Sequence, residues 1–258
     1  MDLIEKKIMS SIFDSQVFNA NLFFPRADSS PALAGIDEYF IDAGNDARIH
    51  VRRHPNPAAK LSLLFFHGNG EIVSDYDNLA EHFSRLGAEL IIADFRGYGK
   101  STGNPTLRSS LEDAHTIFDY LKKEEVFKSI VGVMGRSLGG APTIELCSKR
   151  SHIQACILES AYADPIPLVE RRGLKIDKTT PEEDAVFNNS LKIATVKCPT
   201  LVMHGADDFL ISPQEAKLNY ENAGTKIKTL EILEGVGHND MMMNPSYFST
   251  LKRFFDSL

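Results

Sequence analysis

A serine flanked by two glycines is the residue of this sequence best placed for chemistry. Residues 135–139 read Gly-Arg-Ser-Leu-Gly, so Ser137 lies at the centre of a G-x-S-x-G pattern. The apolar run before it (131–134) is typical of a buried strand, and the run after it, to Lys149, is typical of a helix. A strand-to-helix turn this tight requires glycines and leaves the serine hydroxyl at its tip. The pattern predicts a nucleophilic serine; the alternative is a serine that only caps the helix.

A serine nucleophile needs a base, and the base needs an orienting carboxylate. His238 follows the last predicted strand on a glycine-flanked loop, and an imidazole titrates near neutrality, which suits proton transfer. Asp207 and Asp208 are adjacent and both follow an earlier strand, so either could be the carboxylate. His67 and His204 also follow strand ends, where we expect them to order their loops.

The elements that must position these residues alternate along the chain. A hairpin is predicted over 38–42 and 47–53, and apolar runs predict strands at 61–66, 90–93, 131–134, 155–160, 200–203 and 229–233. Apolar residues at helical spacing predict helices at 77–86, 111–123, 138–149, from 213 onward and 245–255. This alternation implies an α/β fold with a doubly wound, mostly parallel sheet. Ligand sites in such sheets lie beyond the carboxyl ends of the strands, where Ser137, Asp208 and His238 should meet.

Length and composition favour one domain over residues 1–258. The chain has 258 residues, of which 43% are hydrophobic, and this is enough for one large core. Residues 1–30 form an N-terminal extension, whose apolar cluster at 17–25 either packs on the domain edge or contacts a membrane or partner. The alternation lapses between 161 and 197, which predicts a short insertion that caps one end of the sheet. The helix from 213 is expected to begin with a capping box of Ser212 and Glu215.

Charge and composition exclude several classes of protein. The 28 basic and 35 acidic residues leave a formal net charge of −7, which argues against a nucleic-acid partner. The three cysteines lack metal-site spacing, and free thiols in a reducing compartment are favoured over a disulfide. No apolar run approaches a membrane span, and the first residues do not resemble a signal peptide. We therefore expect a soluble, cytoplasmic protein whose oligomeric state is open.

Five motifs together resemble the α/β-hydrolase family. They are the Ser137 pattern and the segments 67–70, 94–101, 204–208 and 237–238, and they lie in the family's order of serine, acid and histidine. The resemblance covers the chain from about residue 61 to its C-terminus and is closest to the esterase and thioesterase branch with a small cap. It implies a sheet of about eight strands preceded by an antiparallel hairpin.

The resemblance also implies a role for each site residue. Ser137 would be the nucleophile and His238 the base. Asp208 is preferred over Asp207 because residues 204–212 match the family's His-Gly-x-x-Asp-x-x-Val-Pro register, with Ser212 in place of proline. The backbone N–H groups of Leu138 and Asn69 would form the oxyanion hole.

The expected activity is hydrolysis of carboxylic esters or thioesters through an acyl-enzyme on Ser137. The substrate would be a small molecule or an acyl compound, and neither a metal nor an organic cofactor is expected. Two alternatives stay open: a catalytically dormant binding protein on the same fold, or an amidase or lyase that uses the same three residues.

Overall fold

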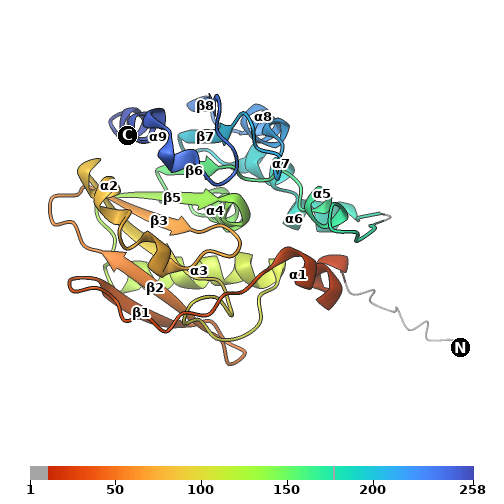
Figure 1. The fold of residues 1–258 in the computed structure, drawn as a ribbon, viewed down its shortest axis with the longest axis horizontal. Coiled ribbons are helices and arrows are strands. Elements are labelled where there is room, and N and C mark those ends of the chain that lie inside the picture. Colours follow the sequence, from red (N-terminus) through yellow and green to blue (C-terminus); the bar gives the residue numbers. More distant parts are fainter. Residues whose placement is uncertain (1–10, 177) are drawn as a thin grey trace, which may run out of the picture.

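The computed structural model describes residues 11–176 and 178–258, so the expectation about the first residues of the chain lies outside the described part. It contains an eight-stranded sheet in the order β1-β2-β4-β3-β5-β6-β7-β8 (Figure 1). The strands are β1 (Asp37–Asp42), β2 (Arg48–His54), β3 (Leu61–Phe66), β4 (Ala88–Ala93), β5 (Ile130–Arg136), β6 (Ala155–Glu159), β7 (Thr200–Gly205) and β8 (Lys228–Leu233). β1 pairs antiparallel with β2, β2 pairs antiparallel with β4, and all other neighbours are parallel. The predicted α/β fold with its antiparallel hairpin is confirmed.

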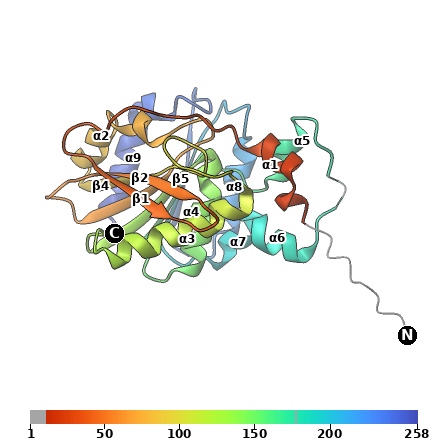
Figure 2. The ribbon, with the colours of Figure 1, turned by 90° about the horizontal axis from the view of Figure 1, so that it is seen from below.

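Helices cover both faces of the sheet, and this explains the unbroken apolar runs of its central strands. All six residues of β3 are buried. Side chains of α2 (Ala80–Arg85) and α9 (Pro245–Phe255) join one buried cluster. Those of α3 (Leu107–Lys123), α4 (Gly140–Lys149) and α8 (Pro213–Asn222) join a second cluster on the opposite face. Figure 2 shows α2 and α9 on one side of the sheet and α3 on the other.

Two helix predictions need correction. The helix expected over 77–86 begins only at Ala80, because a 3₁₀ turn, η2 (Val73–Tyr76), precedes it. Ser212 does cap α8 by accepting the N–H of Gln214, but Glu215 does not complete a capping box. Its Oε2 instead accepts the N–H groups of Ala163 (2.7 Å) and Asp164 (3.3 Å). Glu215 therefore anchors the segment that follows β6 rather than its own helix.

The N-terminal extension packs against the segment inserted between β6 and β7. The inserted segment contains α5 (Ile166–Glu170), α6 (Pro181–Phe187), α7 (Asn189–Lys192) and the 3₁₀ turn η4 (Ile193–Thr195). The extension contains η1 (Ile12–Asp14) and α1 (Gln16–Leu22), which lie at the same end of the molecule as α5 and α6 (Figures 1 and 2). The rings of Phe13 and Phe187 are 4.4 Å apart. Packing of this extension is therefore observed, while a membrane or partner contact stays a prediction.

Candidate active site

Ser137 lies on the sharp turn that its glycines predict. β5 ends at Arg136, and the 3₁₀ turn η3 (Ser137–Gly139) leads directly into α4. Ser137 has a φ of 51°, in the left-handed region that residues other than glycine rarely adopt. A Cβ on Gly135 would lie 2.1 Å from the Gly139 carbonyl oxygen, and one on Gly139 would lie 2.0 Å from the Phe66 carbonyl oxygen. Both glycines are therefore required by direct contact with backbone.

His238 bridges Ser137 and Asp208. Its Nδ1 lies 2.6 Å from Asp208 Oδ2, and its Nε2 lies 3.0 Å from Ser137 Oγ. An ionised carboxylate only accepts hydrogen bonds, so Nδ1 carries the proton and donates it to Asp208. Nε2 of the neutral ring then accepts the hydrogen bond of the serine hydroxyl. Three residues separated by up to 101 positions thus form one hydrogen-bonded chain.

Asp208, and not Asp207, is the aspartate that is hydrogen-bonded to His238. Asp208 is 4% exposed, whereas Asp207 is exposed to solvent. Burial alone would raise the pKa of Asp208, but bonds from His204, His238 and the backbone N–H of Ile211 more than offset it and hold the pKa well below its usual range. His204 Nε2 donates to the Ile211 carbonyl oxygen at 2.8 Å and lies 3.1 Å from Asp208 Oδ2. His204 therefore orders its loop as expected, and it also supports Asp208.

Asn69 and Leu138 both line the same cavity as Ser137. Within the described residues, the backbone N–H of Asn69 makes no hydrogen bond. Leu138 lies in the first turn of a helix, where N–H groups have no helical acceptor. The side chain of Asn69 has a separate role: Nδ2 donates to the Leu22 carbonyl oxygen (2.6 Å), and Oδ1 accepts the Phe24 N–H (2.9 Å). The N-terminal extension is thereby tied to the edge of the site.

Arg136 is a residue of the site to which the sequence pattern assigned no role. Its guanidinium is buried between Glu71 (2.5 Å) and Glu159 (3.2 Å). Nη2 donates to the His238 carbonyl oxygen and to Asn239 Oδ1, both at 2.9 Å. Glu71 in turn accepts the Gly68 N–H at 2.6 Å. Arg136 thus connects the Ser137 turn with the loops that carry His238 and Asn69. The sequence feature that could have predicted this role is a charged residue at the end of an otherwise apolar strand.

The cavity above Ser137 is small, and its walls combine polar and apolar side chains. Its volume is about 170 Å³, and it is lined by the site residues together with Arg172, Asn239, Leu22, Leu168, Leu210 and Ile211. Leu22 comes from the N-terminal extension and Leu168 from the inserted segment. No aspartate or glutamate lines it within the described part of the chain. The arrangement can activate a serine hydroxyl and accommodate a small substrate group beside it.

The profile of one protein family, described as serine aminopeptidase S33, matches residues 57–181 and 185–244. These ranges are more than half of the chain and include Ser137, Asp208 and His238. The chain belongs to this family of α/β-hydrolases.

Curated relatives of this S33-family chain come from several eukaryotes. It is 34% identical over 209 residues to the alpha/beta hydrolase domain-containing protein aho-3 of Caenorhabditis elegans, which covers 78% of this chain and 59% of that protein. It is 32% identical over 213 residues to the human alpha/beta hydrolase domain-containing protein 17B, covering 81% and 70% of the two chains. The chain therefore spans less than two thirds of the nematode relative.

Solved structures of similar fold include an archaeal esterase and a bacterial protein, Est1E. The Pyrococcus furiosus esterase Pf2001 superposes with a TM-score of 0.74 at 19% identity, covering 90% of this chain and 98% of that one. Est1E of Butyrivibrio proteoclasticus, solved with bound ferulic acid, gives 0.70 at 20% identity over 85% and 98% of the chains. At sequence identities of 19% and 20%, these similarities show that the chain shares the fold of the two proteins, and they show nothing about its activity.

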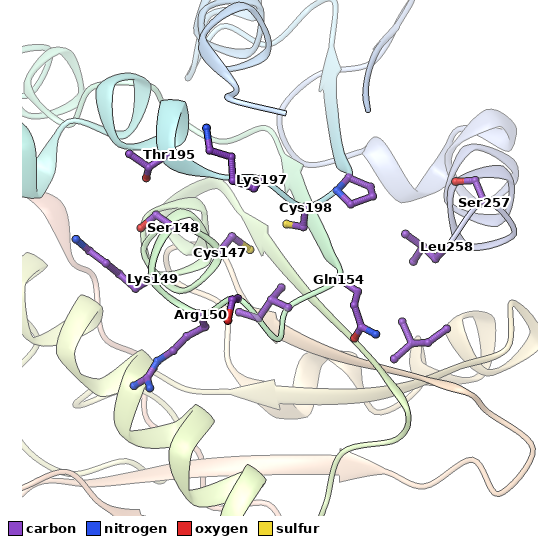
Figure 3. A pocket seen from close by; sticks show the side chains of 14 residues that line it. Cys147, Ser148, Lys149, Arg150, Gln154, Thr195, Lys197, Cys198, Ser257 and Leu258 are labelled. Atoms are coloured by element: carbon purple, nitrogen blue, oxygen red, sulfur yellow. The ribbon is translucent and has the colours of Figure 1, made fainter. Parts of the chain in front are cut away.

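A second cavity of the S33-family chain lies at the opposite edge of the sheet, where β5, β6 and β7 begin. Its volume is about 570 Å³, and its lining includes Lys149, Lys197, Cys147 and Cys198 (Figure 3). These two cysteines and Cys156 are free, as expected. This cavity is larger than the one above Ser137, but its lining includes none of Ser137, Asp208 and His238. We therefore assign it no role in the chemistry at Ser137.

The described residues 11–176 and 178–258 of this family member contain neither a candidate metal site nor a candidate membrane span. In those ranges, no group of three histidine, cysteine, aspartate or glutamate side chains could hold a metal ion. Over the same residues, no helix is both long and apolar enough to cross a bilayer. The cytoplasmic location stays a prediction.

Proposed function

We propose that this α/β-hydrolase is a serine hydrolase that cleaves carboxylic esters or thioesters through an acyl-enzyme on Ser137. The observation that carries the proposal is the position of His238, whose two ring nitrogens contact Ser137 Oγ at 3.0 Å and Asp208 Oδ2 at 2.6 Å. An isolated serine hydroxyl is a poor nucleophile, and a base at this distance is what activates it.

The reaction would proceed in two halves. His238 Nε2 takes the Ser137 proton as Oγ attacks the carbonyl carbon, and the imidazolium then returns that proton to the departing alcohol or thiol. In the second half, His238 takes a proton from water as the water attacks the acyl-enzyme; the acyl–Oγ bond then breaks, the carboxylic acid leaves and the proton returns to Ser137 Oγ. Asp208 keeps the proton on Nδ1 and stabilises the imidazolium without taking up a proton, because its pKa is held low.

The backbone N–H groups of Leu138 and Asn69 would donate to the oxyanion of each tetrahedral intermediate. Support comes from their place in the cavity lining beside Ser137 and from the free Asn69 N–H within the described residues. The segment 161–197 would act as the cap, since its Leu168 forms part of the cavity wall.

An ester or thioester is preferred to a peptide with a free amino terminus, although the family description names an aminopeptidase. A substrate ammonium group would require a carboxylate or several carbonyl oxygens close to the scissile bond. The described cavity lining has no acidic side chain, and the charged residues that it does include are arginines. A dormant binding protein is disfavoured because the Ser137, His238 and Asp208 side chains are already in hydrogen-bonding contact.

The test is hydrolysis of p-nitrophenyl acetate and butyrate and of acyl-thioesters of graded chain length. Wild-type protein should turn over the short esters and should be labelled by a fluorophosphonate probe, whereas Ser137→Ala should show neither property while unfolding at the wild-type temperature. Hydrolysis by Ser137→Ala at the wild-type rate, or a folded wild-type protein that neither reacts with the probe nor cleaves any ester, would contradict the proposal.

A further inference from the structure

The two arginines that line the cavity above Ser137 differ in their charge environment. Arg136 is buried and paired with both Glu71 and Glu159. Arg172 lines the same cavity, yet no carboxylate of residues 11–176 or 178–258 lies within 4.0 Å of its guanidinium. The positive charge of Arg136 is thus compensated by the protein, and that of Arg172 is not.

Arg172 is held in place by contacts that leave its charge available. It follows α5 in the inserted segment, and its Nη1 donates to the Asn21 carbonyl oxygen. The guanidinium carbon lies 4.6 Å from the centre of the Phe24 ring, which is a cation–π contact. Of its five N–H donors, only one therefore has a hydrogen-bond acceptor among the described residues.

The surroundings of Arg172 favour an anion from outside the protein. The Arg172 side chain is exposed to solvent, and no carboxylate of the described residues offsets the local desolvation that lowers the pKa of its guanidinium. The neighbouring Arg171 also has no carboxylate partner among the described residues, and what distinguishes Arg172 is its place in the lining of the cavity above Ser137. A guanidinium presents a planar fork of donors that matches a carboxylate with two parallel hydrogen bonds.

We propose that Arg172 binds a carboxylate of the substrate, so that the preferred esters carry an anionic group a few bonds from the scissile carbonyl. This inference rests on the proposed ester hydrolysis at Ser137 and adds the class of substrate. The cavity volume of about 170 Å³ restricts that substrate to a short chain beside the apolar Leu22, Leu168 and Leu210.

Matched pairs of esters test the proposal directly. Monoethyl glutarate and ethyl valerate have acyl chains of equal length, and only the first ends in a carboxylate; ethanol release measures both. O-butyrylglycolate against ethyl butyrate places the carboxylate on the alcohol side instead. Wild-type protein should prefer the anionic member of at least one pair in kcat/KM, and Arg172→Gln should lower that anionic-to-neutral ratio by about tenfold or more.

Arg171 provides the matched control. It is the neighbouring arginine, it donates to the Leu210 carbonyl oxygen, and it is absent from the cavity lining. Arg171→Gln should keep the wild-type ratio, and Arg172→Lys should keep part of it. If Arg172 only tied the extension to the inserted segment, Arg172→Gln would lower both rates equally, and this result would overturn the proposal.

The two proposals fail in different ways. If wild-type protein hydrolyses the two esters of each pair at equal rates, it is an ester hydrolase without a preference for anions, and only the proposed role of Arg172 is refuted. Wild-type protein that cleaves none of the four esters and is not labelled by a fluorophosphonate overturns both.

Discussion

Two groups of hydrogen-bonded polar residues meet near Ser137. Asp208 and His238 form the chain that leads to the hydroxyl, and Arg136 with its two glutamates lies beneath the adjoining loops. Burial raises the pKa of Glu159, and the charge of Arg136 opposes that effect. Each residue of these groups is therefore stabilised by a partner from a distant part of the chain.

Asp208→Asn should lower kcat for ester hydrolysis by about 10³- to 10⁴-fold. An amide in this position no longer requires the proton to be on His238 Nδ1, and it cannot stabilise the imidazolium. Steady-state kinetics on p-nitrophenyl butyrate measure the loss. The control is Asp207→Asn, because Asp207 is exposed and does not contact His238; equal losses in the two variants would refute the assignment of Asp208.

Arg136→Met should lower the free energy of unfolding by about 3–5 kcal/mol, because it leaves Glu71 and Glu159 without their buried counter-charge. Urea denaturation followed by circular dichroism measures the change. Arg26→Met removes an ion pair with Asp75 whose side chains are 48% and 38% exposed, and it should cost less than about 1 kcal/mol. If the two variants lost similar free energies of unfolding, the buried ion pairs of Arg136 would contribute no more to stability than the exposed pair of Arg26.

At the scale of elements, the turn between β5 and α4 is packed so closely that backbone touches backbone. Gly139 faces the carbonyl oxygen at the end of β3, which belongs to the neighbouring strand of the sheet. The helix can approach the strand only because residue 139 has no side chain. This contact places the N-terminus of α4 beside Ser137 and the loop after β3 beside the same hydroxyl.

Gly139→Ala should destabilise the fold by about 3 kcal/mol, because the new Cβ would lie 2.0 Å from the Phe66 carbonyl oxygen. Gly132→Ala, in the preceding strand β5, is the control, since a Cβ there meets its nearest neighbours at 3.4 Å. Thermal unfolding of both variants compares them. Tolerance of both substitutions would mean that the turn is looser than described.

For the whole molecule, the dependence of stability on pH includes a contribution from a histidine remote from Ser137. His54 ends β2, and burial, followed by the charge of Arg52, lowers its pKa from 6.5 to about 4. Asp77 Oδ1 lies 3.5 Å from Nε2, too far for a strong hydrogen bond that would offset this. The folded chain therefore binds fewer protons at this residue than the unfolded chain between pH 6.5 and 4.

Stability should fall as the pH drops from about 6.5 to about 4, since unfolding takes up a proton at His54 across this window. His54→Gln should remove up to about 3 kcal/mol of that decline. Urea denaturation at intervals of half a pH unit measures the slope for each protein. His152→Gln, at an exposed position, should leave the slope unchanged; an unchanged slope for His54→Gln as well would exclude this assignment.

Local patterns were sufficient for the features that depend on neighbouring residues in the chain. Apolar runs identified the strands within about two residues, and the glycines beside Ser137 predicted a turn that the structure contains. The order of strand ends predicted that Ser137, Asp208 and His238 meet. These inferences succeed because strand burial and tight turns follow from side-chain type and short spacing.

Contacts between segments that are distant in the sequence could be identified only in the tertiary structure. The bonds of Asn69 to the N-terminal extension, the two glutamates around Arg136 and the bonds of Glu215 to Ala163 and Asp164 join residues 45 to 65 positions apart in most cases. No periodicity signals such a pair, because a charged or amide side chain can bond to any partner that the fold brings within reach. The uncompensated charge of Arg172 is of the same kind: only the folded chain places it in the cavity above Ser137, with no carboxylate of the described residues beside it.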